Sequence, residues 1–378
     1  MRLMPISMCR PGMRLAKNVY NEEGMVLLAV HVELTQRLLE RLYEYGIDYL
    51  YISDPRTEDV VIDEPIQEET RTKGIQEIRT TFRKLMEDTS KRGAVSYYDL
   101  GRTFRELMNA IIDDISSHPQ AMLMLTNMNI ADSYLFQHSL NVCIYGTMLG
   151  ISHGMSRDEL MTLGLGALLH DIGKTRIPIS ILRKPSQLTT EEYEEMKAHT
   201  THGFHILKDS PNIPLISAHI AYQHHERLNG SGYPRGLKGD DIHEFARWIA
   251  VVDSYDAMTT TRVYRGPMLP HQAMEQLFTG SGTLYDQEKI ALFRDKIAIY
   301  PLGIPVRLNT GERGIVARLN SAVPHRPIVR VLQDAAGRQL KEGHEIDLSV
   351  RLSVLITEIG DRLVNEQYPG DPGIEAWG

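Results

Sequence analysis

Two short segments of this chain place adjacent ionisable side chains inside apolar sequence, and this constrains the fold more than any other feature. Residues 167–178 read ALLHDIGKTRIP, and residues 224–237 read HHERLNGSGYPRGL. Imidazole and carboxylate groups on an apolar segment are costly to bury unless something binds them. A divalent metal ion can satisfy several such groups at once. The two segments therefore predict a metal site and the hydrolytic chemistry that metal sites support.

Composition and charge narrow the class of partner. The chain has 378 residues, enough for two or three domains with a sizeable core. Its formal net charge of −8 argues against duplex nucleic acid as the main partner, because such binding usually needs a basic face. The two cysteines, Cys9 and Cys143, provide neither a disulfide framework nor a cysteine-based zinc site, which indicates a reducing compartment.

No apolar run approaches the roughly 18 to 20 residues of a membrane span. The first thirteen residues include Pro5, Ser7 and Pro11, which interrupt the apolar region that a signal peptide needs. We therefore expect a cytoplasmic, soluble protein whose only route to a membrane is through a partner.

The residue pattern divides the chain into four segments. Residues 1–62 have the mixed pattern of a small α/β accessory or sensory module. Residues 63–129 begin acidic and polar, then turn helical, and are interpreted as a linker with connector helices. Residues 130–300 carry repeated helical patterns and are predicted to be an all-helical catalytic domain. Residues 301–378 contain short β-rich runs and are predicted to form a small β-rich module with a frayed tail, so the fold class is mainly α.

Individual elements can be predicted within these segments. The pattern predicts a hairpin over residues 19–30, an amphipathic helix over residues 34–45 and a strand over residues 49–52. It also predicts a helix over residues 157–171. Short strands are expected in the last segment at residues 306–308, 314–317, 328–332 and 346–348.

More histidines and another aspartate join the two segments in the predicted helical domain. His138 lies in FQHSLNV, and His199 lies in a helix that Thr189 opens with a capping box. Asp253 lies in IAVVDSYDAM, a nearly apolar segment where a lone carboxylate would be costly. Each residue alone has an ordinary structural explanation, such as a helix cap or a histidine bonded to a carbonyl. Their joint presence on helices of one domain favours a metal site.

These residues occur in the order and spacing of the HD-GYP family, which the chain resembles over about residues 130–300. That family is similar to the wider HD phosphohydrolase superfamily, and its members are cyclic di-GMP phosphodiesterases. The likeness extends to ILRKPSQLT and to DSYDAMTTTRVYRGP, and the N-terminal module resembles one found ahead of such domains. The residues that carry the resemblance are His138, His170, Asp171, Lys174, His199, His224, His225, Gly232, Tyr233, Pro234 and Asp253.

The resemblance implies two divalent ions, Fe or Mn, at the base of a cleft, with Asp171 bridging them. One ion is assigned to His138, His170, Asp171 and Asp253, and the other to Asp171, His199, His224 and His225. Some members hold a third metal through a glutamate one turn before the first histidine. Tyr134 occupies that position here, which favours a dinuclear site. Asn229 stands where the family usually has aspartate, although asparagine also suits a turn before Gly230.

The resemblance also implies roles for residues beside the metals. Asp171 and Lys174 are the expected catalytic residues, with Lys174 offsetting phosphate charge. Arg262 and Arg265 resemble residues that bind the far phosphate and a guanine, contacts that suit the bidentate guanidinium group. Tyr233 and Pro234 are expected to contact the substrate, the tyrosine as a stacking surface for a base.

Three functions remain open from the sequence. The first is a phosphodiesterase that linearises cyclic di-GMP to pGpG, with further hydrolysis to GMP left open. The second is a cyclic di-GMP receptor with little turnover, in which the flanking modules pass the signal on. The third is an HD phosphohydrolase acting on another cyclic dinucleotide. The sequence does not choose between a homodimer and a separate signalling partner.

Overall fold

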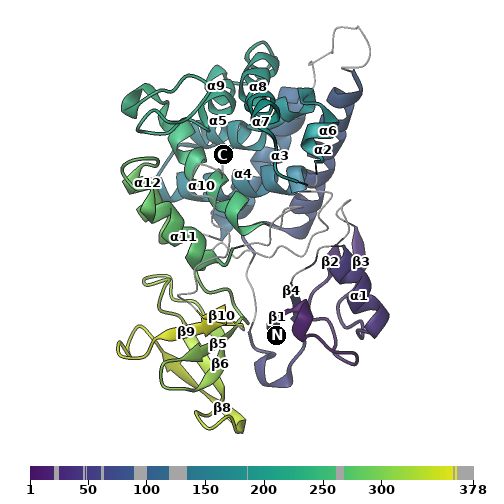
Figure 1. The fold of residues 1–378 in the computed structure, drawn as a ribbon, viewed down its shortest axis with the longest axis vertical. Helices are drawn as coiled ribbons and strands as arrows, with labels where there is room; N and C mark the ends of the chain where they lie inside the picture. The colour runs from purple at the N-terminus through teal and green to yellow at the C-terminus, as the bar shows by residue number, and fades with distance from the viewer. Residues whose placement is uncertain are drawn as a thin grey trace.

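The computed structural model places a helical body above two smaller modules that lie beside each other (Figure 1). The structure describes residues 1–20, 25–45, 47, 49–60, 64–88, 100–118, 134–184, 186–260, 268–360 and 362–363. Helices dominate the upper body and strands the lower end, which confirms the expected fold class.

The N-terminal module is a small α/β unit, as predicted. Strand β1 (Arg2–Pro5) pairs antiparallel with β4 (Tyr49–Ile52), and β2 (Val19–Tyr20) pairs antiparallel with β3 (Val26–Leu28). Helix α1 (Gln36–Glu44) begins at Thr35, whose side chain accepts a hydrogen bond from the Leu38 N–H. The turn expected at residues 21–24 lies outside the described residues. The short 3-10 helices of the module are η1 (Ile6–Met8) and η2 (Pro55–Thr57).

The helical body is built around α4 (Tyr134–His153), which is buried along most of its length and packs against α2, α3, α5 and α10. A helix that buries nearly all of its side chains belongs in the interior, and most of α4 is buried in this way. The other longer helices are α2 (Glu68–Asp88), α3 (Leu100–Ser117), α5 (Arg157–Leu168), α8 (His199–Lys208), α9 (Leu215–Gln223), α10 (Glu244–Thr259), α11 (Pro270–Thr279) and α12 (Gln287–Arg294). The shorter ones are η5 (Ile172–Arg176), α6 (Ile179–Leu182), α7 (Thr190–Lys197) and η6 (Gly239–Asp241).

Helices α2 and α3 share one apolar core with α4 and α5. Phe82 and Phe104 are fully buried there together with Leu140 and Leu163. The segment interpreted as linker and connector helices therefore contributes to the helical body. The division of the chain at residues 62, 129 and 300 stays a prediction.

The helix expected over residues 157–171 begins as predicted but ends earlier. Ser156 and Glu159 form a capping box at its start, and α5 ends at Leu168. Residues 169–177 continue in tight i→i+3 turns, with the Lys174 N–H donating to the Asp171 carbonyl oxygen at 2.9 Å. The tighter turn takes His170 and Asp171 off the helix and into the centre of the body.

The C-terminal module is an antiparallel sheet with the strand order β10-β9-β5-β6-β7-β8, which confirms the β-rich prediction. Its strands are β5 (Pro305–Leu308), β6 (Arg313–Arg318), β7 (Ile328–Gln333), β8 (Gln339–Asp347), β9 (Ile356–Ile359) and β10 (Arg362–Leu363). Three of the four expected runs lie within β5, β6 and β7. The run at residues 346–348 covers only the end of β8, and β9 and β10 were not predicted. The expected tail at residues 368–378 lies outside the described residues.

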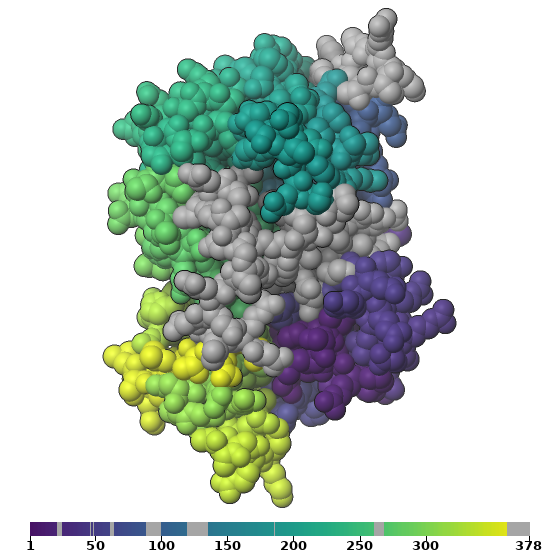
Figure 2. Space-filling model, viewed as in Figure 1, coloured from purple at the N-terminus to yellow at the C-terminus, as the bar shows by residue number. Residues whose placement is uncertain are grey.

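The N-terminal and C-terminal modules share an apolar core, and Figure 2 shows them meeting at the lower end of the molecule. Leu3 and Tyr51 bury their side chains with Ile304 and Val316. The Leu3 N–H donates to the Gly303 carbonyl oxygen at 2.9 Å, and Arg330 forms an ion pair with Asp59 at 2.6 Å. The described parts of the N-terminal and C-terminal modules therefore form one lower body. Across the described part of the chain, no helix has the length and apolar character that spanning a membrane requires.

Candidate metal centre

Seven side chains that the sequence analysis singled out meet in the interior of the helical body. His138 comes from α4, His170 and Asp171 from the turn after α5, His199 from the start of α8, and Asp253 from α10; His224 and His225 follow α9. All seven are at most 5% exposed. Five elements that are distant in the sequence therefore bring their polar side chains to one buried point.

The first group in this centre contains His138, His170, Asp171 and Asp253. The His138 Nε2 atom lies 3.0 Å from Asp253 Oδ1 and 3.8 Å from Asp171 Oδ2. The His170 Nε2 atom lies 3.4 Å from Asp171 Oδ2 and 3.6 Å from Asp253 Oδ1. Two imidazole nitrogens and two carboxylate oxygens thus face one small volume, as metal ligands do.

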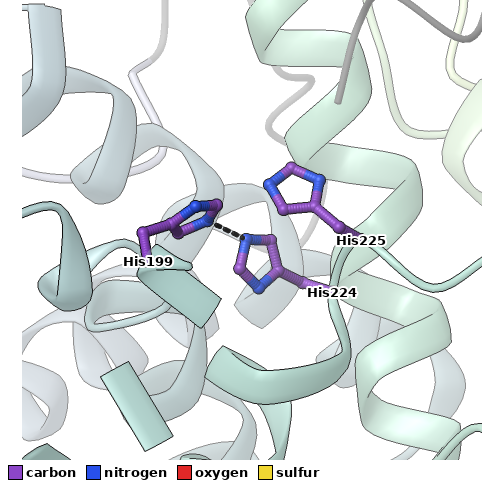
Figure 3. A group of neighbouring side chains, drawn as sticks. All are labelled: His199, His224 and His225. Carbon is purple, nitrogen blue, oxygen red and sulfur yellow. Dashed lines mark hydrogen bonds between the residues drawn. The ribbon is translucent and has the colours of Figure 1, made fainter. Parts of the chain in front are cut away.

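The second group contains His199, His224 and His225, whose rings turn toward one another (Figure 3). The His199 and His224 Nε2 atoms lie 3.4 Å apart, and the ring centroids of His224 and His225 are 4.1 Å apart. Asp171 joins this group through its other oxygen, because Oδ1 lies 3.5 Å from His199 Nε2 and 4.0 Å from His224 Nε2. One carboxylate therefore faces two clusters of imidazoles, one with each oxygen.

Hydrogen bonds to Nδ1 fix how four of these imidazole rings point. His170, His199 and His224 use Nδ1 to bond the carbonyl oxygens of Ala167, Met196 and Ala221, at 2.7, 2.7 and 3.0 Å. His138 uses Nδ1 to bond Asp256 Oδ2 at 2.7 Å. A carbonyl or carboxylate partner on Nδ1 selects the tautomer that presents Nε2 as a ligand, which is the arrangement found at metal-bound histidines.

Sequence reasoning missed Asp256, the carboxylate behind His138. Its side chain is fully buried, and its Oδ1 accepts a hydrogen bond from the Asn141 amide at 2.9 Å. Asp256 lies three residues after Asp253 on α10, and that spacing places two residues on one helix face. A second acidic residue in the apolar segment IAVVDSYDAM was the signal that could have identified it.

The residues of the centre fit a divalent metal. His170 Nε2, Asp171 Oδ1 and His225 Nδ1 are buried side-chain atoms that have no hydrogen-bond partner within the described residues. Unpartnered buried polar atoms cost free energy, and imidazole and carboxylate donors suit divalent transition metals. The orphaned atoms and the donor types both indicate a site for divalent metal ions.

Comparison with known protein families agrees with this geometry. The HD domain family matches residues 110–288, a segment that contains all seven of these side chains. Residues 110–288 resemble an HD domain. A KOW domain associated with HD domains matches residues 305–362, the C-terminal sheet. These matches and the named relatives below are consistent with the resemblance to the HD-GYP family.

Three relatives carry names that state a substrate. A cyclic di-GMP phosphodiesterase, PA4108, from Pseudomonas aeruginosa is 33% identical over 271 residues, covering 71% of this chain and 63% of the relative. A cyclic di-GMP phosphodiesterase from Thermotoga maritima is 47% identical over 142 residues, covering 37% of this chain and 38% of the relative. A 3'3'-cGAMP-specific phosphodiesterase 2 from Vibrio cholerae is 32% identical over 219 residues, covering 57% of this chain and 40% of the relative. The chain thus spans from about two fifths to less than two thirds of each relative's length.

The histidine pKa values differ between the first and the second group of side chains. Burial lowers the pKa of His199 to about 4, and it lowers the pKa values of His224 and His225 well below the usual range. These three imidazoles are therefore neutral near pH 7 and available as ligands. Burial also acts on His170, but the neighbouring Asp171 and Asp253 carboxylates outweigh it and raise the pKa of His170 to about 10. A metal ion held at the first group would compete with a proton for His170.

The structure describes only some of the residues that are expected to contact the substrate. Lys174 Nζ donates a hydrogen bond to Asp171 Oδ2 at 2.6 Å. The Tyr233 ring stacks on His225, with ring centroids 4.7 Å apart and an interplanar angle of 25°, and Pro234 is exposed. Arg262 and Arg265 lie outside the described residues, as does the side chain of Tyr134.

Asn229 forms the turn that the sequence suggested. Its Oδ1 accepts a hydrogen bond from the Ser231 N–H at 2.9 Å, and Gly230 has a positive φ of 84°. Asparagine therefore supports this loop although the family usually has aspartate there.

Proposed function

We propose that this chain is a metal-dependent cyclic dinucleotide phosphodiesterase and that its substrate is cyclic di-GMP. The observation that carries the proposal is Asp171, whose two carboxylate oxygens face two adjoining groups of buried imidazoles. The names of the Pseudomonas and Thermotoga relatives support the substrate class. Together they favour an enzyme over a protein that only binds the nucleotide.

The seven buried side chains would hold two divalent ions, with His138, His170 and Asp253 at one, His199, His224 and His225 at the other, and Asp171 at both. Iron and manganese both suit this mixture of imidazole and carboxylate donors. When bound, the metals supply Lewis acidity to a phosphodiester oxygen and lower the pKa of water. The balanced reaction adds one water across one P–O3′ bond, leaving a 3′ hydroxyl and a 5′ phosphate in linear pGpG.

Lys174 would contribute positive charge beside this centre. Its Nζ atom lies 2.6 Å from Asp171 Oδ2, and its side chain is 20% exposed, so it reaches both the buried carboxylate and the surface. An ammonium group in this place would offset the negative charge that develops on phosphoryl oxygens in the transition state. We assign Lys174 the role of stabilising that charge.

A second substrate has specific support. The 3'3'-cGAMP-specific relative from Vibrio cholerae is nearly as similar in identity as the Pseudomonas protein, at 32% against 33%. The two cyclic dinucleotides share the phosphodiester linkage and differ in one base, so the metal centre does not distinguish them. Discrimination must come from residues that contact the bases.

The test is hydrolysis of both nucleotides by protein purified without oxygen and loaded with Fe(II) or Mn(II). We expect cyclic di-GMP to be linearised faster than 3'3'-cGAMP, and Asp171→Asn to lower turnover at least 100-fold. Asp209→Asn, at an exposed carboxylate after α8, is the matched control and should retain activity. Tight binding of cyclic di-GMP by metal-loaded protein without turnover would contradict the enzyme and indicate a receptor. Faster turnover of 3'3'-cGAMP would correct the substrate.

A further inference from the structure

The loop over residues 226–237 contains the Gly-Tyr-Pro sequence and folds back onto the second group of histidines. Tyr233 places one face of its ring on His225, with centroids 4.7 Å apart, and its ring centroid lies 6.4 Å from that of His199. The Tyr233 N–H also donates to the His225 carbonyl oxygen at 3.2 Å. The loop therefore contacts the side chain and the backbone of a metal-ligand candidate.

Glu226 closes this loop with its side chain. Its Oε1 accepts a hydrogen bond from the Arg235 N–H at 2.8 Å, and its Oε2 accepts one from the Leu237 N–H at 2.9 Å. Glu226 is only 2% exposed. A buried carboxylate that accepts two backbone N–H bonds forms strong, charge-assisted contacts, so it fixes the far end of the loop to the near end.

Gly232 allows the loop to approach this closely. A Cβ atom at Gly232 would overlap the Arg227 backbone nitrogen and the His225 carbonyl oxygen. Backbone atoms cannot move aside as a flexible side chain can, so a side chain at this position would push the loop away from His225. The missing Cβ atom of Gly232 therefore allows the loop to lie this close to His225.

The start of the loop is held against the body of the domain. Arg227 is 7% exposed, donates to the His224 carbonyl oxygen at 3.0 Å and places its guanidinium 5.0 Å from the centre of the Tyr285 ring. Tyr285 in turn donates from its hydroxyl to Ser254 on α10 at 2.9 Å. Both ends of the loop are thus fixed, one to the helical body and one through Glu226.

We propose that Glu226 is a positioning residue for the second metal subsite. By joining the two ends of the loop, Glu226 holds the Tyr233 ring in contact with His225 and keeps that imidazole aligned with His199 and His224. The proposal rests on the metal centre of the proposed function and gives Tyr233 a role besides contact with a base, because one face of its ring covers His225. A loop that opens would leave His225 free to rotate and would weaken one metal site more than the other.

The test compares Mn(II) binding by Glu226→Gln, Tyr233→Ala and Tyr233→Phe with that of the wild type. Glutamine keeps the shape but offers one acceptor oxygen and turns an NH₂ group toward a backbone N–H. Glu195→Gln, at an exposed carboxylate of α7, is the matched control. Metal per chain is measured by elemental analysis, and affinity by titration calorimetry. Melting of the metal-free protein shows whether each variant folds as the wild type does.

We expect Glu226→Gln and Tyr233→Ala to lose about one of two ions per chain, or to bind that ion at least tenfold more weakly, while the metal-free variants still melt in a cooperative transition. Tyr233→Phe keeps the stacked ring and should bind two ions. The positioning role is overturned, while the metal centre stands, if Glu226→Gln and Tyr233→Ala bind both ions as tightly as wild type and Asp171→Asn does not. A wild-type protein that binds no Mn(II) overturns both proposals.

Discussion

Asp256 lies behind His138, outside the set of proposed metal ligands, and would tune the proposed metal centre. Asp256 bonds the Nδ1 atom of His138 at 2.7 Å and holds the ring so that Nε2 faces Asp253. Burial would lower the pKa of His138, but the hydrogen bonds to Asp253 and Asp256 outweigh that effect and raise it. A carboxylate behind a ligand imidazole makes the imidazole a stronger metal ligand.

Replacing Asp256 with asparagine should weaken the first metal subsite. The new side chain would keep the volume, but its neutral amide would orient and polarise His138 less strongly. We expect the affinity for one Mn(II) ion to fall about 10-fold to 100-fold, measured by calorimetric titration. Asp113→Asn, at an exposed aspartate that pairs with Arg157, is the control and should bind like the wild type. Unchanged affinity in Asp256→Asn would show that Asp256 only fills space.

The sequence identified which residues belong to the site more readily than which residues those side chains contact. His138, His199 and Asp253 stand out in apolar helical sequence, because few other roles explain such residues there. The bond between Asp256 and His138 joins residues 118 positions apart, and no local pattern encodes it. The same reason hid the contact of Tyr233 with His225, since the sequence suggested only that the ring was available for stacking.

Among the elements, the turn η5 packs closely against α8. A Cβ atom at Gly173 would overlap the His199 carbonyl oxygen and the Gly203 nitrogen of α8. This packing explains why the helix predicted to reach residue 171 ends at Leu168: a tertiary contact requires the tighter turn, and periodicity alone cannot reveal it. Strand β9 was missed for a related reason, because its partner β5 lies about 50 residues earlier in the chain.

The facing glycines of η5 and α8 give a matched pair of substitutions. Gly173→Ala should force η5 away from α8 and destabilise the protein by at least the roughly 1–3 kcal/mol typical of overpacking. Gly203→Ala should be neutral or stabilising, since its Cβ atom would lie 3.5 Å from that of Ala221 and alanine favours helices. Thermal melting of the two variants checks this. Equal melting temperatures would show that η5 and α8 are not in close contact.

At the scale of the whole molecule, charged contacts reinforce the shared core of the two terminal modules. Arg330 on β7 bonds both carboxylate oxygens of Asp59 at 2.6 Å and also the Arg56 carbonyl oxygen at 3.0 Å. The bond from Arg330 outweighs the small effect of burial and lowers the pKa of Asp59 to about 2. A lowered pKa means that the pair is complete above the ordinary value of 3.8 and is lost as the pH falls through about 2.

Removing Arg330 should loosen the lower body and leave the helical body unchanged. In Arg330→Ala we expect faster hydrogen exchange in β1 and β4 and the wild-type rate in α4 and α5 near pH 7. Arg338→Ala, at an arginine that is 81% exposed and paired within its own module, is the control. Faster exchange spread evenly over both bodies would contradict a local role for Arg330.

The core that Leu3 and Tyr51 share with Ile304 and Val316 has a consequence for how the chain is made. Leu3 and Tyr51 leave the ribosome long before Ile304. Their apolar side chains therefore stay exposed to water while the helices that separate them from Ile304 in the sequence are synthesised. The helical body can complete its own core during that delay, whereas the lower body can form its shared core only after strands β5 and β6 emerge. The nascent chain should therefore expose these apolar side chains until the sheet that contains Ile304 and Val316 emerges, which makes it a client for chaperones during that delay.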